Sequence, residues 1–88
     1  YGLPDLGMTT LDNVLEEARR ITDAVGLPLL VDIDTGWGSS LMIAKTIRQM
    51  ARASVAAVHI EDQLLEKRCG HRPGKLLVSK EEMCDRIK

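Results

Sequence analysis

A regular alternation of helical and strand-like hydrophobic patterns is the strongest constraint on the fold of this chain. Apolar residues recur at helical spacing over residues 11–25 and 40–52, and the sequence SKEE at 79–82 is a capping box that predicts the start of a third helix. Residues 29–34 and 55–61 are short and largely apolar, as is typical of buried strands. Because helices alternate with buried strands, we expect crossovers between parallel strands and an α/β fold.

The composition restricts the classes of function. The 88 residues are 44% hydrophobic and 28% charged, with a formal net charge of -1, which indicates neither a nucleic-acid partner nor an acidic tail. No apolar run approaches the roughly 20 residues of a membrane span. Two cysteines are too few for a disulfide framework and match no zinc spacing, so free thiols and a cytoplasmic location are expected. Because Tyr1 is not a natural start, we expect the chain to be part of a longer protein.

Carboxylates gather where the predicted strands end. Asp32 and Asp34 are two positions apart and are expected to share one face of the first strand, and Glu61 ends the second strand. Asp5 precedes the first helix, where an earlier strand would end. Ligands of parallel α/β folds bind at the carboxyl ends of strands, and four acids meeting there would repel one another without a cation or protons. The pattern predicts a site for Mg²⁺, which prefers oxygen ligands, with Mn²⁺ as the alternative.

Each of these residues also has a purely structural interpretation. A D-x-D pair at a strand end can cap a helix or bond to a loop. His59 is expected to be a hydrogen-bonded interior residue rather than a ligand, and Trp37 can simply fill the core. Gly36 and Gly38 are expected to let the backbone approach a ligand closely. The metal interpretation is favoured because the acids all fall at one edge of the sheet.

The stretch KRCGHRPGK, residues 67–75, places a thiol among basic residues on the loop that leaves the same edge. Cys69 lies eight positions after Glu61, which is close enough to reach over the predicted metal. The pair Lys67 and Arg68 would by default be part of a solvated loop. Cys84 lies in a predicted helix without reactive neighbours, so a structural role is expected for it.

Four motifs in this order resemble the isocitrate lyase and phosphoenolpyruvate mutase superfamily. They are LPDLG at 3–7, VDIDTGWG at 31–38, HIEDQ at 59–63 and KRCGHRPGK at 67–75, and the resemblance covers essentially the whole chain. It implies a (β/α)₈ TIM-type barrel, which needs roughly 250 residues. Residues 1–88 would then be a partial barrel domain with about two βα units, a flanking helix and a gating loop. The resemblance also implies that the parent enzyme is a homotetramer.

The resemblance assigns a role to each candidate site residue. Asp32 and Asp34 match the metal pair, and Asp5 and Glu61 match the acids that complete the metal shell directly or through water. Cys69 matches the catalytic cysteine. The loop residues that match the gating loop, which closes on the substrate carboxylates, are Lys67, Arg68, Gly70 and His71. A serine and glycine pair before Asp5 and later arginine, glutamate and asparagine positions of the family are absent from this chain.

The reaction implied by the resemblance is a Mg²⁺-dependent retro-aldol cleavage of a carbon–carbon bond in a small carboxylic acid. In the branch whose motifs match best, 2-methylisocitrate gives succinate and pyruvate. Cleavage of isocitrate, or action on another 2-hydroxy or 2-oxo acid, is the alternative. An alternative of another class is a catalytically inert fragment whose exposed sheet edges associate with another chain.

Overall fold

The computed structural model describes residues 1–65, 67 and 69–88, so the prediction for Arg68 lies outside the described residues. The elements in chain order are α1 (Leu11–Ala24), β1 (Leu30–Asp32), α2 (Ser40–Arg52), β2 (Ala57–His59) and α3 (Lys80–Ile87). The predicted α/β class and order of elements are therefore confirmed. Each strand has three residues and is shorter than the predicted segment. No helix in the described part of the chain is long and apolar enough to cross a membrane.

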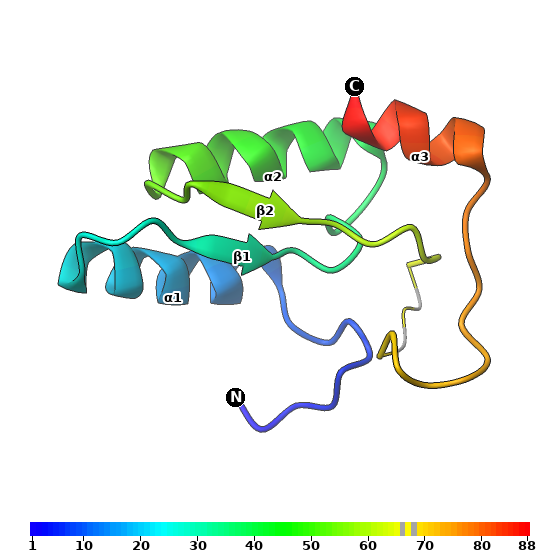
Figure 1. Cartoon of the computed structure of the whole chain (residues 1–88), viewed down its shortest axis with the longest axis horizontal. Coiled ribbons are helices and arrows are strands. Elements are labelled where there is room, and N and C mark those ends of the chain that lie inside the picture. The colour runs from blue at the N-terminus through cyan, green and yellow to red at the C-terminus, as the bar shows by residue number, and fades with distance from the viewer. Residues whose placement is uncertain (66, 68) are drawn as a thin grey trace.

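The two strands are parallel, and their pairing sets the register of the site. Val31 lies opposite Val58, and Asp32 lies opposite His59. Backbone bonds continue past the strands, where the amide of Ile33 donates to the His59 carbonyl at 2.9 Å. The amide of Glu61 donates to the Asp34 carbonyl at 2.7 Å. The segments that follow β1 and β2 therefore run side by side (Figure 1).

The core lies between the sheet and its two long helices. The buried residues that form it come from α1, from α2 and its C-cap, and from the position directly after β1: Leu11, Leu15, Ile33, Met50 and Ala53. Val31 and Val58 point from the middle of the strands into this core, and α1 contacts α2 beside them. Because side chains alternate along a strand, Asp32 and His59 point to the opposite face.

That opposite face is left uncovered by the described residues. The side chain of His59 is 61% exposed, so the expected interior position of this histidine is wrong for the chain as described. Leu30 on the same face is 64% exposed. The sheet is therefore covered by helices on one side only.

The turn after β1 is fixed by its packing against α2. Gly36 has φ +88°, and a Cβ atom there would lie 2.5 Å from Cγ1 of Ile43. A Cβ atom at Gly38 would lie 2.7 Å from Cβ of Met42. The absence of side chains at these glycines thus serves close packing within the chain, and the expected approach of a ligand stays a prediction.

Trp37 in the same turn joins it to the N-terminal segment. Its Nε1 donates to the Thr9 carbonyl at 2.8 Å, so Trp37 makes a specific contact in addition to its core packing. The next residue, Thr10, caps α1 in a reciprocal capping box with Asn13. These contacts hold the segment that carries Asp5 near the end of β1.

We predict that the isolated 88-residue chain self-associates and lacks a sharp unfolding transition. Its sheet has two strands among the described residues, and large apolar side chains are exposed, including Leu27 at 75% and Leu41 at 80%. Sedimentation velocity over a range of concentrations should give an average mass above 9.7 kDa. A monomer that melts cooperatively at every concentration would contradict this prediction.

Candidate active site

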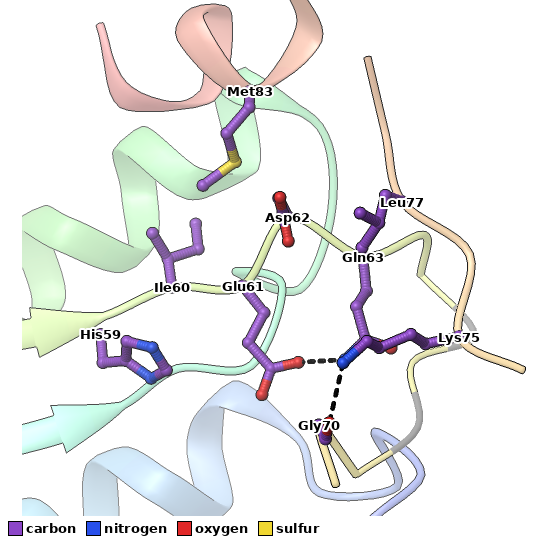
Figure 2. Close-up of a pocket in the computed structure, with 9 residues that line it drawn as sticks. All are labelled: His59, Ile60, Glu61, Asp62, Gln63, Gly70, Lys75, Leu77 and Met83. Atoms are coloured by element: carbon purple, nitrogen blue, oxygen red, sulfur yellow. Dashed lines mark hydrogen bonds between the residues drawn. The ribbon is translucent and has the colours of Figure 1, made fainter. Parts of the chain in front are cut away.

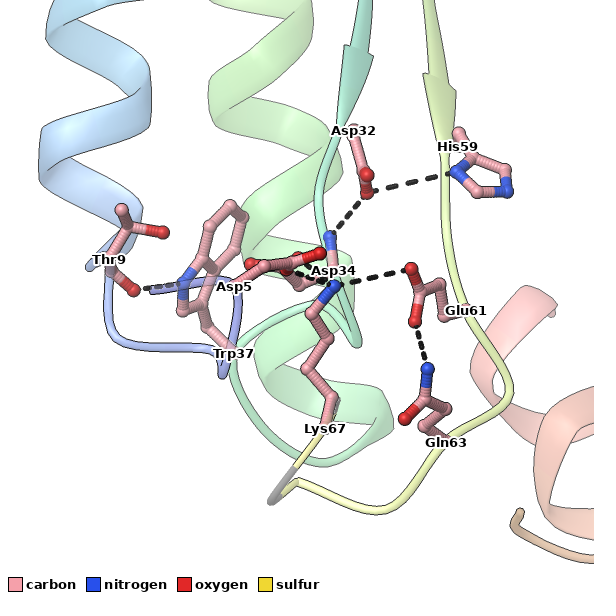
Figure 3. Close-up of polar contacts among 9 residues, drawn as sticks. All are labelled: Asp5, Thr9, Asp32, Asp34, Trp37, His59, Glu61, Gln63 and Lys67. Atoms are coloured by element: carbon pink, nitrogen blue, oxygen red, sulfur yellow. Dashed lines mark hydrogen bonds and ion pairs between the residues drawn. The ribbon is translucent and has the colours of Figure 1, made fainter. Parts of the chain in front are cut away.

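Three carboxylates from distant parts of the chain meet at one lysine (Figure 3). Nζ of Lys67 lies 2.6 Å from Oδ1 of Asp5 and 3.0 Å from Oδ1 of Asp34. It lies 3.3 Å from Oε1 of Glu61. The lysine side chain is 2% exposed, and burying an ammonium group is costly unless anions pair with it. The three acids provide that pairing, and we call Asp5, Asp34 and Glu61 the acid cluster.

The backbone beyond the strands places two members of the acid cluster. The bond from the Glu61 amide to the Asp34 carbonyl sets these residues next to each other. Asp34 has φ 51°, and its amide donates to Oδ1 of Asp32 at 2.9 Å, as in turns that aspartate stabilises. Asp32 and Asp34 were expected to share one face of the first strand. That explanation is wrong, because β1 ends at Asp32 and strand alternation does not place Asp34. A tight turn brings Asp34 to the cluster instead.

Asp32 lies beside the acid cluster and is not bonded to Lys67. Its Oδ1 is 3.7 Å from Nδ1 of His59. Asp5, Asp32 and Asp34 line one open pocket of about 270 Å³. Within the described residues, no group of three or more histidine, cysteine, aspartate or glutamate side chains is arranged to hold a metal ion by itself. The ammonium of Lys67 lies between three of the four predicted metal ligands.

The contact between Lys67 and the acids stabilises the ionised forms of both Asp5 and Lys67. The hydrogen bond from Lys67 holds the pKa of Asp5 below its ordinary value, although desolvation acts in the other direction. Burial acts to lower the pKa of Lys67, but the hydrogen bonds to Asp5, Asp34 and Glu61 outweigh it, so the pKa of the lysine is raised. Asp5 is therefore an anion and Lys67 a cation at neutral pH.

The cysteine of the basic loop also reaches the acid cluster. Cys69 is partly buried, and a hydrogen bond to its side chain further lowers the pKa of Asp5. The next residues, Gly70 and His71, are exposed. The structure thus brings Lys67 and Cys69 to the acids and leaves Gly70 and His71 at the surface. Cys84 is exposed on α3.

Two residues that support Glu61 were not predicted from the sequence. Gln63 is 3% exposed, and its Nε2 donates to Oε2 of Glu61 at 2.5 Å. The other carboxylate oxygen of Glu61, Oε1, faces Lys67. Arg86 on α3 donates from Nη1 to the Gln63 carbonyl at 3.0 Å. The position of Gln63 directly after the HIED sequence is a usable signal. No local sequence pattern identifies Arg86 as a site residue, because its partner Gln63 lies 23 residues away in the chain.

A second pocket, of about 440 Å³, borders Glu61 (Figure 2). Its polar lining includes Glu61, His59, Gln63 and Lys75. Nζ of Lys75 donates to the Gly70 carbonyl at 2.8 Å, so this lysine braces the loop and does not touch the acid cluster. Asp5 and Asp34 thus line one open pocket and Glu61 lines the other.

Comparison with known proteins identifies close relatives of the chain. All of residues 1–88 match the family model for phosphoenolpyruvate phosphomutase. The 2-methylisocitrate lyase of Shewanella oneidensis is 65% identical over 88 residues, which are 100% of this chain and 30% of that protein. The chain thus spans about 30% of the length of the curated relative.

Solved structures agree with the family match. The crystal structure of 2,3-dimethylmalate lyase, a PEP mutase/isocitrate lyase superfamily member, is 43% identical with a TM-score of 0.94, over 99% of this chain and 29% of that one. Phosphonopyruvate hydrolase in complex with oxalate and Mg²⁺ is 30% identical with a TM-score of 0.82, over 99% of this chain and 29% of the other. The resemblance seen in the sequence is confirmed, and the chain belongs to the phosphoenolpyruvate mutase family of the PEP mutase/isocitrate lyase superfamily.

Proposed function

We propose that the chain is the part of a Mg²⁺-dependent carbon–carbon lyase that carries its metal-binding acids and its proton donor. The proposed reaction is retro-aldol cleavage of 2-methylisocitrate to succinate and pyruvate. The main support is the meeting of the acid cluster and Cys69 at the ends of parallel strands. The identity of 65% to a 2-methylisocitrate lyase supports this substrate over isocitrate.

The charge and the ligand chemistry of the residues present favour a divalent cation, although the described side chains do not form a ready-made metal site. One ammonium cannot neutralise the acid cluster and Asp32 together, so the site keeps an excess of negative charge that favours a second cation. Carboxylate oxygens are the ligands that Mg²⁺ prefers, and Asp5, Asp32 and Asp34 line a common pocket. A superfamily structure with bound Mg²⁺ gives further support. In this proposal Asp32 and Asp34 hold Mg²⁺, or Mn²⁺, and Asp5 and Glu61 complete the shell directly or through water.

The chain's own residues then have distinct tasks. Mg²⁺, when bound, would lower the pKa of the substrate hydroxyl and stabilise the negative charge that develops on its oxygen. A general base takes the proton of the substrate hydroxyl, and cleavage of the carbon–carbon bond then leaves an electron pair on carbon in the departing dicarboxylate. The thiol of Cys69 donates its proton to that carbon, which releases succinate. The side chain of Cys69 helps to lower the pKa of Asp5, so the thiol lies close to this carboxylate, and we assign Asp5 the task of orienting it.

The loop residues complete the proposal. By the family resemblance, the basic loop closes over the carboxylates of the substrate. The residues assigned to this contact are Lys67, Arg68, Gly70 and His71. The exposed position of His71 is compatible with such a contact.

A (β/α)₈ barrel is the proposed architecture of the complete enzyme. Helices α1 and α2 cover one face of the sheet, while Asp32 and His59 project from the other face. A barrel has this arrangement, because its helices surround the strands on the outside only. Residues 1–88 would be about two βα units of the barrel domain, in a cytoplasmic enzyme that forms a homotetramer.

We predict that a full-length protein carrying this segment forms pyruvate and succinate from 2-methylisocitrate only when Mg²⁺ or Mn²⁺ is present. Product formation can be followed by coupling pyruvate to lactate dehydrogenase, with and without a chelator. Isocitrate serves as the matched substrate and should be cleaved more slowly. Faster cleavage of isocitrate, or full activity in the chelator, would contradict the proposal.

The 88-residue chain alone should be inactive under the same conditions, because it spans about 30% of its relative. This expectation separates the role of a partial domain from that of an autonomous enzyme. Catalytic turnover by a monodisperse preparation of the short chain would show that the segment is sufficient.

We predict that Cys69→Ser lowers turnover by roughly 10²- to 10⁴-fold, the usual contribution of a positioned general acid. The replacement is nearly isosteric, but a hydroxyl is a far weaker acid than a thiol. Turnover, Mn²⁺ affinity and thermal stability should be measured together, and the last two should stay close to wild type.

Cys84→Ser is the matched control, because it makes the same replacement at an exposed thiol on α3. Its turnover should equal that of the wild type. If Cys69→Ser keeps more than about a tenth of wild-type turnover, Cys69 is not the proton donor.

A further inference from the structure

The burial of Lys67 is unusual for a lysine in a basic loop. Its side chain is 2% exposed, whereas lysine heads normally stay in water. The stem of the side chain packs beside Gly7, where an added Cβ would lie 3.4 Å from Cγ of Lys67. Fixing this long side chain costs conformational entropy, which its contacts must outweigh. Those contacts are the three carboxylates of the acid cluster.

We propose that Lys67 is a built-in counter-cation of the acid cluster. Its ammonium group holds Asp5, Asp34 and Glu61 together, and it opposes the binding of a divalent cation to the same carboxylates. The inference rests on the proposed function, because the opposing cation is the Mg²⁺ or Mn²⁺ proposed for this site. It gives Lys67 a task that differs from contact with the substrate.

The geometry explains why the two cations oppose each other. The ammonium engages one oxygen from each acid of the cluster, at distances of 2.6, 3.0 and 3.3 Å. A divalent cation that uses these carboxylates must share their charge with Lys67, and it would lie only a few ångströms from a second positive group. Binding linkage is reciprocal, so a bound metal must also weaken the hold of the acids on Lys67.

The first test compares Mn²⁺ affinity among variants of the full-length protein by electron paramagnetic resonance. Lys67→Met removes the charge and keeps the length of the side chain, and it should tighten Mn²⁺ binding by ~10-fold or more, from the Coulomb repulsion that it removes. Lys67→Arg keeps the positive charge and should therefore show no such gain in Mn²⁺ affinity. Unchanged or weaker binding in Lys67→Met would overturn the inference.

Lys75→Met is the matched control for the loss of one positive charge from the same loop. Nζ of Lys75 bonds to the Gly70 carbonyl and does not touch the acid cluster, so Mn²⁺ affinity should change less than about twofold. An equal gain of affinity in both variants would mean that general loop charge, and not the contact of Lys67, sets the affinity. That result would also overturn the inference.

Asp34→Ala separates failure of this inference from failure of the proposed function. The proposed metal site requires wild-type protein to bind Mn²⁺ and Asp34→Ala to bind it more weakly. If wild-type protein does not bind Mn²⁺, the proposed site and the inference both fall. If Asp34→Ala loses affinity while Lys67→Met gains none, only the inference falls.

A measurement on the unaltered protein covers the case in which Lys67→Met does not fold. Acetic anhydride labelling with mass spectrometry reports how accessible each lysine is. Saturating Mn²⁺ should increase labelling of Lys67 relative to Lys75, because the bound metal weakens the contacts of Lys67. Equal labelling with and without Mn²⁺ would overturn the inference.

Discussion

The candidate site depends on a single buried ammonium group that faces three carboxylates. Without the charge of Lys67, Asp5, Asp34 and Glu61 would repel one another, and without these acids the lysine could not remain 2% exposed. The contact joins the N-terminal segment, the segments after β1 and β2, and the basic loop. Because the loop is held at this point, Cys69 lies within hydrogen-bonding reach of Asp5.

The architecture and the meeting of the acids could be predicted from the sequence because both follow from local patterns. Hydrophobic periodicity gave the order of helices and strands, and helix-strand alternation implied parallel pairing. Parallel strands end at one edge of a sheet, so Asp34 and Glu61 could be expected in the same region, where the Glu61 amide donates to the Asp34 carbonyl. Asp5 could be included among the predicted site residues because it precedes α1 at the same edge of the sheet.

The remaining features depend on contacts that sequence patterns do not encode. A lysine in a basic loop normally stays in water, so Lys67 gave no sign of being the buried partner of the acids. Asp34 reaches the cluster through a backbone with φ 51°, which strand periodicity does not describe. Arg86 supports Gln63 across 23 residues. The predicted interior position of His59 was wrong because the described chain leaves one face of its sheet uncovered.

The most direct test of this account is the pKa of the Asp5 carboxyl group in the folded full-length protein, measured by carbon-13 NMR of labelled aspartate. We expect a pKa below the ordinary value of 3.8, because Lys67 donates a hydrogen bond to the ionised carboxylate. In Lys67→Met the pKa of Asp5 should rise, since the donor is lost and the neighbouring acids remain. The same pKa in both proteins would show that Lys67 does not hold the acids together.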